Sequence, residues 1–106
     1  MAKYKVSDLI NKLKTGSEKV VIYGAGDFGQ LVLGALKIYD VKVSFFCDSN
    51  SRKHNTIFQQ IEVISPETLS QIGPNVHVFI ANHFVDQVYY KLQKNGLLNL
   101  YNCTDL

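Results

Sequence analysis

The chain reads Val-Val-Ile-Tyr-Gly-Ala-Gly-Asp-Phe-Gly over residues 20–29, and a helical-looking segment comes directly after it. An apolar run, a glycine turn and a helix are typical of the opening of a β-α-β unit. Gly24 permits a tight turn, Gly26 lets another backbone or a ligand approach, and Gly29 lets the helix pack closely on the strand. Because this glycine spacing is used to seat a pyrophosphate, the nearest chemistry is nucleotide binding.

A second apolar run, Val41–Cys47, comes after the helix and ends in Asp48. A β-α-β unit is right-handed almost without exception, so the glycine turn and Asp48 are expected together at the carboxyl edge of neighbouring strands. Asp48 lies nineteen residues after Gly29, close to the roughly 20 expected for the acid that accepts from ribose hydroxyls. The pattern predicts nucleotide contacts from the backbone amides of residues 26–29 and from Asp48. A purely structural role stays open for both, because α/β domains without a ligand also contain them.

The rest of the chain alternates helix-like and strand-like segments. A short amphipathic helix, with its start at Ser7 and its stop at Gly16, precedes the first strand. After a polar loop come further predicted strands and helices: strands 61–64, 76–81 and 97–102, and helices 66–72 and 85–95. The alternation predicts an α/β fold with a doubly wound, mostly parallel, five-stranded Rossmann-like sheet. We expect residues 1–106 to form one Rossmann-like domain, with an N-terminal helix within residues 1–17 packed on it.

Asp27 stands inside the glycine turn and weakens the case for a pyrophosphate. A carboxylate at the start of a helix satisfies the same amides and helix dipole that a phosphate would use. Two like charges ~6 Å apart repel by roughly 3 kcal/mol at an effective dielectric constant of about 20. We therefore expect Asp27 to cap the helix, which favours a ligand held less conventionally than a dinucleotide, or no ligand at all.

Polar residues at other predicted strand ends are weaker candidates. Asn82 and His83 come after the strand 76–81 at the same carboxyl edge, where they are placed to contact a base or a sugar. Their structural alternative is favoured, because Asn82 is also a good N-cap and His83 has no partner acid nearby. Arg52 and Lys53 come soon after Asp48, where some related domains place a cation against an adenosine 2′-phosphate. Repulsion from Asp48 favours a solvated loop instead.

The sequence predicts neither a catalytic set nor a metal site. No Ser-His-Asp or Cys-His arrangement is recognisable, and His54 and His77 lack metal-ligand spacing with another histidine or a cysteine. Cys47 and Cys103 end apolar runs without a CxxC motif, so we expect small buried hydrophobic side chains and no disulfide.

Composition limits the partners. The chain is 46% hydrophobic and 19% charged, with a formal net charge of +2 and scattered lysines. No basic stripe suggests nucleic acid, and no apolar run approaches the ~18 residues that span a bilayer. No targeting signal is recognisable. We therefore expect a cytoplasmic protein that has neither a nucleic-acid nor a membrane partner.

Four segments carry a resemblance to a known kind of module. They are residues 20–29, Phe45–Asp48, Ile61–Glu67 and Phe79–Asn82. Together they look like a Rossmann-like module of surface-glycan and sugar-modifying enzymes. Over about residues 18–103 the chain resembles the N-terminal domain of bacterial sugar O-acyltransferases, and similar modules are attached to some sugar methyltransferases.

The resemblance implies a bound UDP-sugar. By position, it implies contacts from Gly24, Ala25, Gly26, Asp27, Phe28, Asp48 and Asn82, in addition to the Gly29 amide expected from the glycine motif. The chain departs from the acyltransferases in two ways. It has no counterpart of their left-handed β-helix, which binds acetyl-CoA, and Gln60 stands where they often have glycine before the third strand.

Three functions are open as hypotheses. The first is a nucleotide- or nucleotide-sugar-binding domain that serves surface-glycan or sugar modification together with a catalytic domain or partner subunit, and that is not a complete enzyme alone. The second is an NAD(P)-binding module of an oxidoreductase. The third is a ligand-free interaction domain.

Overall fold

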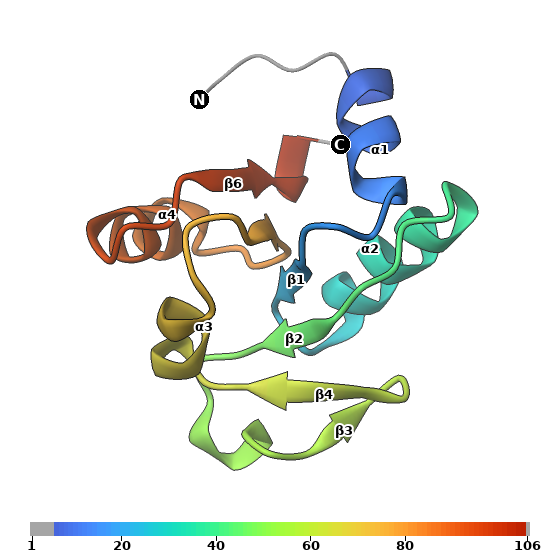
Figure 1. The fold of residues 1–106 in the computed structure, drawn as a ribbon. Coiled ribbons are helices and arrows are strands. Elements are labelled where there is room, and N and C mark those ends of the chain that lie inside the picture. The colour runs from blue at the N-terminus through green and yellow to red at the C-terminus, as the bar shows by residue number, and fades with distance from the viewer. Residues whose placement is uncertain (1–5, 106) are drawn as a thin grey trace.

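The computed structural model describes residues 6–105, so the first five residues and Leu106 of the predicted domain lie outside the described range. Figure 1 shows the fold. The helices and strands occur in the order α1 (Val6–Lys14), β1 (Val20–Tyr23), α2 (Asp27–Ile38), β2 (Phe45–Cys47), β3 (Ile57–Phe58), β4 (Ile61–Ile64), α3 (Pro66–Ile72), β5 (His77–Ile80), α4 (Val85–Lys94) and β6 (Asn99–Asn102). Two short 3-10 helices, Ser51–Lys53 and Cys103–Asp105, complete the described part of the chain.

The described strands form one six-stranded sheet in the order β3-β4-β2-β1-β5-β6. All neighbours are parallel except β3 and β4. The chain crosses from β4 over to β5, on the other side of β1, which is the reversal of direction that defines a doubly wound sheet. The predicted α/β, mostly parallel Rossmann-like fold is confirmed, and β6 lies at an edge as expected.

The sheet has one strand more than the five predicted. Ile57–Phe58 pairs antiparallel with β4 inside the segment 49–60, which its polar composition predicts to be a loop. The two-residue connection consists of Gln59 and Gln60, with φ of 53° and 66°. Such turns usually carry Asn-Gly or Asp-Gly. Since Gln-Gln gives no turn signal and the strand is only two residues long, the sequence pattern does not predict this hairpin.

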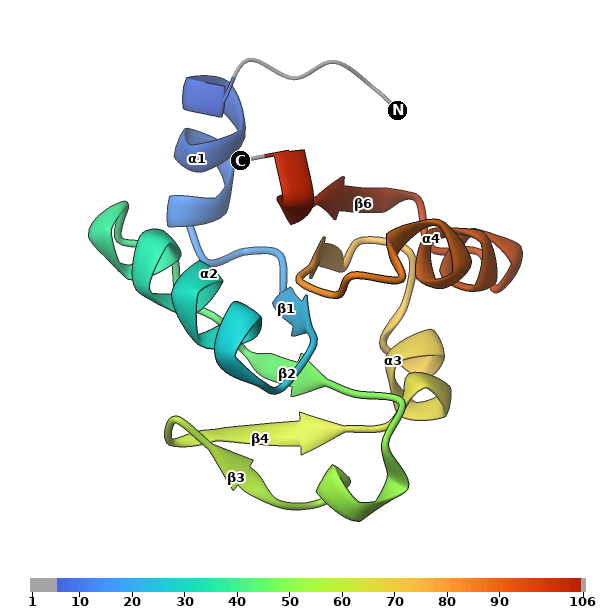
Figure 2. The same ribbon diagram turned by 180° about the vertical axis from the view of Figure 1, so that it is seen from behind.

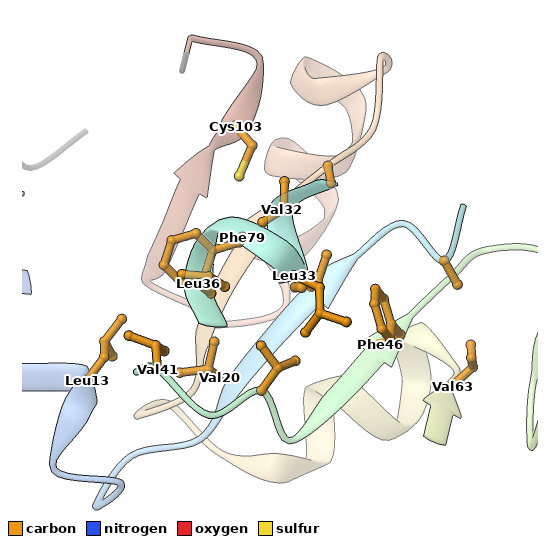
Figure 3. Close-up of a cluster of buried hydrophobic side chains, with 14 residues drawn as sticks. Leu13, Val20, Val32, Leu33, Leu36, Val41, Phe46, Val63, Phe79 and Cys103 are labelled. Carbon is orange, nitrogen blue, oxygen red and sulfur yellow. The ribbon is translucent and has the colours of Figure 1, made fainter. Parts of the chain in front are cut away.

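Alternate residues of β1 face two separate hydrophobic clusters. Val20 and Ile22 belong to the cluster under α1 and α2, whereas Val21 and Tyr23 belong to the cluster under α3 and α4. Figure 3 shows the first cluster, where Val32, Leu33 and Leu36 of α2 lie over the sheet. Figures 1 and 2 show α2 on the opposite side of the sheet from α3 and α4. The sheet is therefore covered on both faces, which explains why β1 is continuously apolar.

Most predicted element boundaries agree with the structure to within a few residues. Helix α3 matches its prediction, and the Ser65 hydroxyl accepts a hydrogen bond from the backbone N–H of Thr68 at 3.1 Å as a cap. Helix α1 begins at Val6, one residue before the predicted start. Strand β2 begins only at Phe45, although Val41 and Val43 before it are buried. Burial thus extends further along this segment than strand pairing does.

The two cysteines are free and buried, as predicted. Within residues 6–105, no helix combines the length and the apolar character needed to cross a lipid bilayer.

Candidate functional site

Three strands end side by side at the carboxyl edge of the sheet. Tyr23, the last residue of β1, pairs with Cys47 at the end of β2 and with Ile80 at the end of β5. The residues next in the chain after these strands therefore share one edge. They are Gly24, Asp48 and Ala81.

Close backbone packing explains two of the three glycines in the turn. Gly24 has a φ of 127°, and a Cβ atom there would overlap the carbonyl oxygen of Ala81. A Cβ atom at Gly29 would overlap the carbonyl oxygen of Gly24. Gly26 differs, because its φ is −150° and its Cβ would first meet the Lys53 ammonium nitrogen at 4.0 Å. The fold therefore requires Gly24 and Gly29, whereas Gly26 leaves space above the turn.

The Asp48 carboxylate binds the glycine turn itself. Its Oδ2 accepts a hydrogen bond from the backbone N–H of Ala25 at 2.9 Å, and its Oδ1 accepts one from the backbone N–H of Asn50 at 2.9 Å. The side chain is only 16% exposed. Since each carboxylate oxygen accepts more than one hydrogen bond, these contacts leave capacity for a ligand hydroxyl. The ribose contact of Asp48 stays a prediction.

Lys53 reaches back over the turn from the 3-10 helix Ser51–Lys53. Its Nζ donates a hydrogen bond to the carbonyl oxygen of Ala25 at 2.8 Å and lies 3.7 Å from Oδ2 of Asp48. Asp48 and Lys53 thus bind the N–H and the C=O of the same residue. From its sequence position this cation is a candidate for an adenosine 2′-phosphate, but the structure places it at the glycine turn.

Asp27 does not cap α2, so that prediction is wrong. The N-cap is Gly26, which supplies no side-chain hydrogen bond, and Asp27 is already the first helical residue. A capping side chain must stand at the N-cap to reach the amides two or three residues ahead. The exposed Asp27 carboxylate still lies at the positive end of the helix. The N-cap therefore leaves the first amides of α2 without a side-chain acceptor.

All eight predicted site residues line one cleft of about 400 Å³. They are Gly24, Ala25, Gly26, Asp27, Phe28, Gly29, Asp48 and Asn82. The rest of the lining consists of Ser49, Lys53, Ala81, His83 and Phe84. Lys53 and His83 are candidate site residues from the sequence, whereas Ala81 and Phe84 are not predicted from it to be part of the site. Their position at the end of the strand 76–81 was the available signal, since residues at that edge converge on the turn.

The end of the cleft next to α4 is aromatic. The Phe28 and His83 rings have centroids 5.5 Å apart, and Phe84 is 67% exposed. Oδ1 of Asn82 accepts a hydrogen bond from the backbone N–H of Phe84 at 2.7 Å. Because the N-cap of α4 is Phe84, Asn82 organises the preceding turn and does not cap the helix. The cleft therefore combines charged groups with aromatic rings.

Two ionisable side chains beneath this edge are held in their neutral forms. Burial, with smaller contributions from Cys47 and Asp48, raises the pKa of Tyr23 to about 12. Burial, together with the Asp48 carboxylate, raises the pKa of the Cys47 thiol far above its usual range. Neither group supplies a thiolate or phenolate at neutral pH. Over residues 6–105, no group of three or more His, Cys, Asp or Glu side chains is arranged to hold a metal ion.

The fold and the cleft define a Rossmann-like α/β domain with a candidate ligand site at the carboxyl edge of its parallel strands. The chain belongs to the C-methyltransferase C-terminal domain family, whose model matches residues 1–97. A comparison with curated proteins found no sequence match. The expected likeness to methyltransferase modules is thus confirmed at the level of the family, whereas the likeness to sugar O-acyltransferases is not shown.

Two kinds of solved structure are similar in fold. RSP, a Rex-family repressor, shares 19% sequence identity over 93% of this chain and 53% of its own, with a TM-score of 0.63. UDP-D-quinovosamine 4-dehydrogenase from Vibrio fischeri shares 23% identity over 83% of this chain and 81% of its own, with a TM-score of 0.61. The chain spans about half the length of the repressor. At these identities the likeness shows the fold alone.

The prediction that excludes nucleic acid as a partner is wrong. The similar repressor is also solved in complex with β-NAD+ and operator DNA, with a TM-score of 0.63. Scattered lysines on a domain of this fold are therefore no ground for excluding DNA as a partner.

Proposed function

We propose that this chain binds a nucleotide or nucleotide-sugar in the cleft, with a UDP-sugar as the favoured ligand, and that it serves the C-methylation of a sugar. The observation that carries the proposal is the convergence of the glycine turn, the start of α2 and Asp48 on one cleft. Membership of the C-methyltransferase family supports it, since a transferase must hold its acceptor. In this proposal the chain is one cytoplasmic domain that binds and orients a ligand without a complete catalytic set.

The position of Lys53 beside the glycine turn supports a phosphate ligand in the cleft. Asp27 by itself would repel a phosphate by roughly 3 kcal/mol at ~6 Å and an effective dielectric constant of about 20. The Lys53 ammonium lies 4.0 Å from the Cβ position of Gly26, so its attraction offsets part of this repulsion, while the same ammonium also lies 3.7 Å from Oδ2 of Asp48. A diphosphate above Gly26 would bind that ammonium together with the first amides of α2.

The same cleft also supports a second candidate, an NAD(P)-binding module. RSP is solved in complex with β-NADH, with a TM-score of 0.62 to this chain. Asp48 has the spacing of a ribose-binding acid, which suits a dinucleotide as well as a nucleotide-sugar. The two ligands differ in the group attached to the far end of the diphosphate, so a comparison of ligands separates the two candidates.

A thermal-shift panel tests the proposal. The ligands are UDP-glucose, UDP-N-acetylglucosamine, NAD, NADP, CoA and S-adenosylmethionine, each at millimolar concentration. A ligand at 100 times its dissociation constant adds roughly 2.7 kcal/mol to the free energy of unfolding. For a chain of this size, that raises the melting temperature by more than about 10 °C. We expect this shift with the UDP-sugars.

Two glycine variants test whether the ligand binds at the glycine turn. One changes Gly26, the N-cap of α2, and the other changes Gly34 within α2. Gly26→Val places a side chain above the turn without meeting backbone and is expected to abolish the shift. Gly34→Val, where a Cβ atom meets nothing within 4 Å, is expected to keep it. Stabilisation by NAD or NADP alone would favour the second candidate. If no ligand stabilises the protein, both proposals fail and the ligand-free interaction domain stands.

A further inference from the structure

A second hollow, of about 390 Å³, adjoins the candidate cleft at the start of α4. It is lined by His83, Phe84, Val85, Asp86, Gln87 and Thr104. His83 and Phe84 line both hollows, so the two spaces are neighbours. These two side chains stand at the junction of the two spaces.

The junction presents an aromatic ring in a defined place. Phe84 is 67% exposed, although its backbone N–H is bonded to Oδ1 of Asn82 at 2.7 Å. Behind it, Val88 and Leu92 anchor α4 in the core. The backbone that carries the ring is thus held, while the ring itself faces solvent. Phe84 thus offers an exposed ring between the two hollows.

The polar lining of the second hollow differs from that of the cleft. It contains the Asp86 carboxylate and the Gln87 amide from the first turn of α4, both exposed, and the Thr104 hydroxyl. The Asp86 carboxylate accepts hydrogen bonds from hydroxyls, the Gln87 amide accepts and donates them, and Oγ1 of Thr104, which donates to Oδ1 of Asn102, accepts them. Among the described residues that line the hollow there is no lysine or arginine, whereas the cleft has Lys53. A phosphate therefore has a cation to bind in the cleft and none among the described residues that line the second hollow.

A pyranose sugar matches this lining. It has a face of C–H groups, which packs on an aromatic ring, and a rim of hydroxyls, which bonds to carboxylate, amide and hydroxyl groups. We propose that the hollow lined by Phe84, Asp86, Gln87 and Thr104 is the sugar subsite of a nucleoside-diphosphate sugar. This inference rests on the proposed function, with the diphosphate at the glycine turn.

Calorimetric titration of the whole chain with UDP, UDP-glucose and UDP-N-acetylglucosamine tests the subsite. We expect at least one UDP-sugar to bind about tenfold more tightly than UDP, which corresponds to about 1.4 kcal/mol. Asp86→Ala and Gln87→Ala, which line the second hollow and not the cleft, should remove this gain and leave the affinity for UDP unchanged. Gln93→Ala, an exposed change on the same helix, should leave both affinities unchanged.

The affinity for UDP distinguishes a failure of the sugar subsite from a failure of the proposed nucleotide site. If UDP binds but neither sugar adds affinity, the subsite is overturned and the nucleotide site stands. The subsite is also overturned if Asp86→Ala and Gln87→Ala weaken UDP and the UDP-sugars equally. If neither UDP nor a UDP-sugar binds, the proposed function and the subsite fail together. Retained binding of UDP in each variant shows that the variant is folded.

Discussion

At the scale of single residues, the three glycines of one motif have two different physical roles. Gly24 and Gly29 face backbone carbonyl oxygens where a Cβ atom does not fit, and Gly24 also has a φ of 127°. Gly26 faces open space toward Lys53. The motif therefore combines two positions that allow the fold with one that leaves room for a ligand. Sequence spacing alone does not separate these roles.

This difference predicts unequal effects on stability. Gly29→Ala is expected to lower the free energy of unfolding by about 2 kcal/mol or more, because its methyl group would be forced against the Gly24 carbonyl. Gly26→Ala should cost less than about 1 kcal/mol, the difference between alanine and glycine as an N-cap. Urea denaturation of both variants measures the two values. Equal losses would show that the turn is packed differently from this description.

At the scale of elements, the β3–β4 hairpin carries strain in its turn. Gln59 and Gln60 both have positive φ, which costs a residue with a side chain roughly 1–2 kcal/mol. The hairpin follows the 3-10 helix Ser51–Lys53, from which Lys53 reaches the glycine turn. Glycine would fit the observed backbone at Gln60, because its φ is 66°.

Replacing the turn with Asn-Gly is expected to stabilise the protein. The double change Gln59→Asn and Gln60→Gly suits two residues with positive φ, and we expect a gain of about 1 kcal/mol in the free energy of unfolding. Thermal or urea unfolding measures it. Gln93→Asn on α4 serves as a control for the loss of a glutamine. A loss of stability in the double variant would contradict the turn geometry.

At the scale of the whole molecule, His77 joins parts of the chain that are distant in sequence. It is 1% exposed at the start of β5, where its Nε2 is bonded to the Glu18 carboxylate and its Nδ1 to the Tyr101 hydroxyl at 2.8 Å. Glu18 also lies 3.5 Å from Nζ of Lys12 in α1. A carboxylate only accepts, so Nε2 carries the hydrogen. This network lies at the amino end of β5, away from the cleft.

The network predicts how stability depends on pH. The hydrogen bond from His77, with help from the His77 and Lys12 charges, lowers the pKa of Glu18 from its ordinary value of 4.5. A lowered pKa in the folded state contributes stability above the unfolded value, and this contribution is lost as pH falls through the folded value. Wild-type protein should therefore lose free energy of unfolding below about pH 4.5.

Glu18→Gln tests this dependence. Denaturant unfolding between pH 7 and pH 3 should show a shallower loss for Glu18→Gln than for the wild type, because glutamine does not titrate. Asp40→Asn, at an exposed residue, is the control and should keep the wild-type slope. If the free energy of unfolding of Glu18→Gln fell with pH as steeply as that of the wild type, Glu18 would not be the cause of the pH dependence.

Much of the fold could be predicted from local pattern. The order of strands and helices, the parallel sheet and the Ser65 cap are all consequences of periodicity and of residue types that act on their nearest neighbours. The eight candidate site residues could be grouped as well, because the ends of parallel strands meet at one edge. The sixth strand could not be predicted, since Gln59 and Gln60 adopt a turn that other residues usually mark.

By itself the sequence determined the strand, the glycine turn and the helix, because these depend on residues within a few positions of one another. Only the tertiary structure decided which side chains fill the space around the turn. Lys53 bonds to Ala25 across 28 positions, and Phe84 lines the cleft from the N-cap of α4. Such placements depend on strand register and on long flexible side chains. A pattern of residue types along the chain does not record either of them.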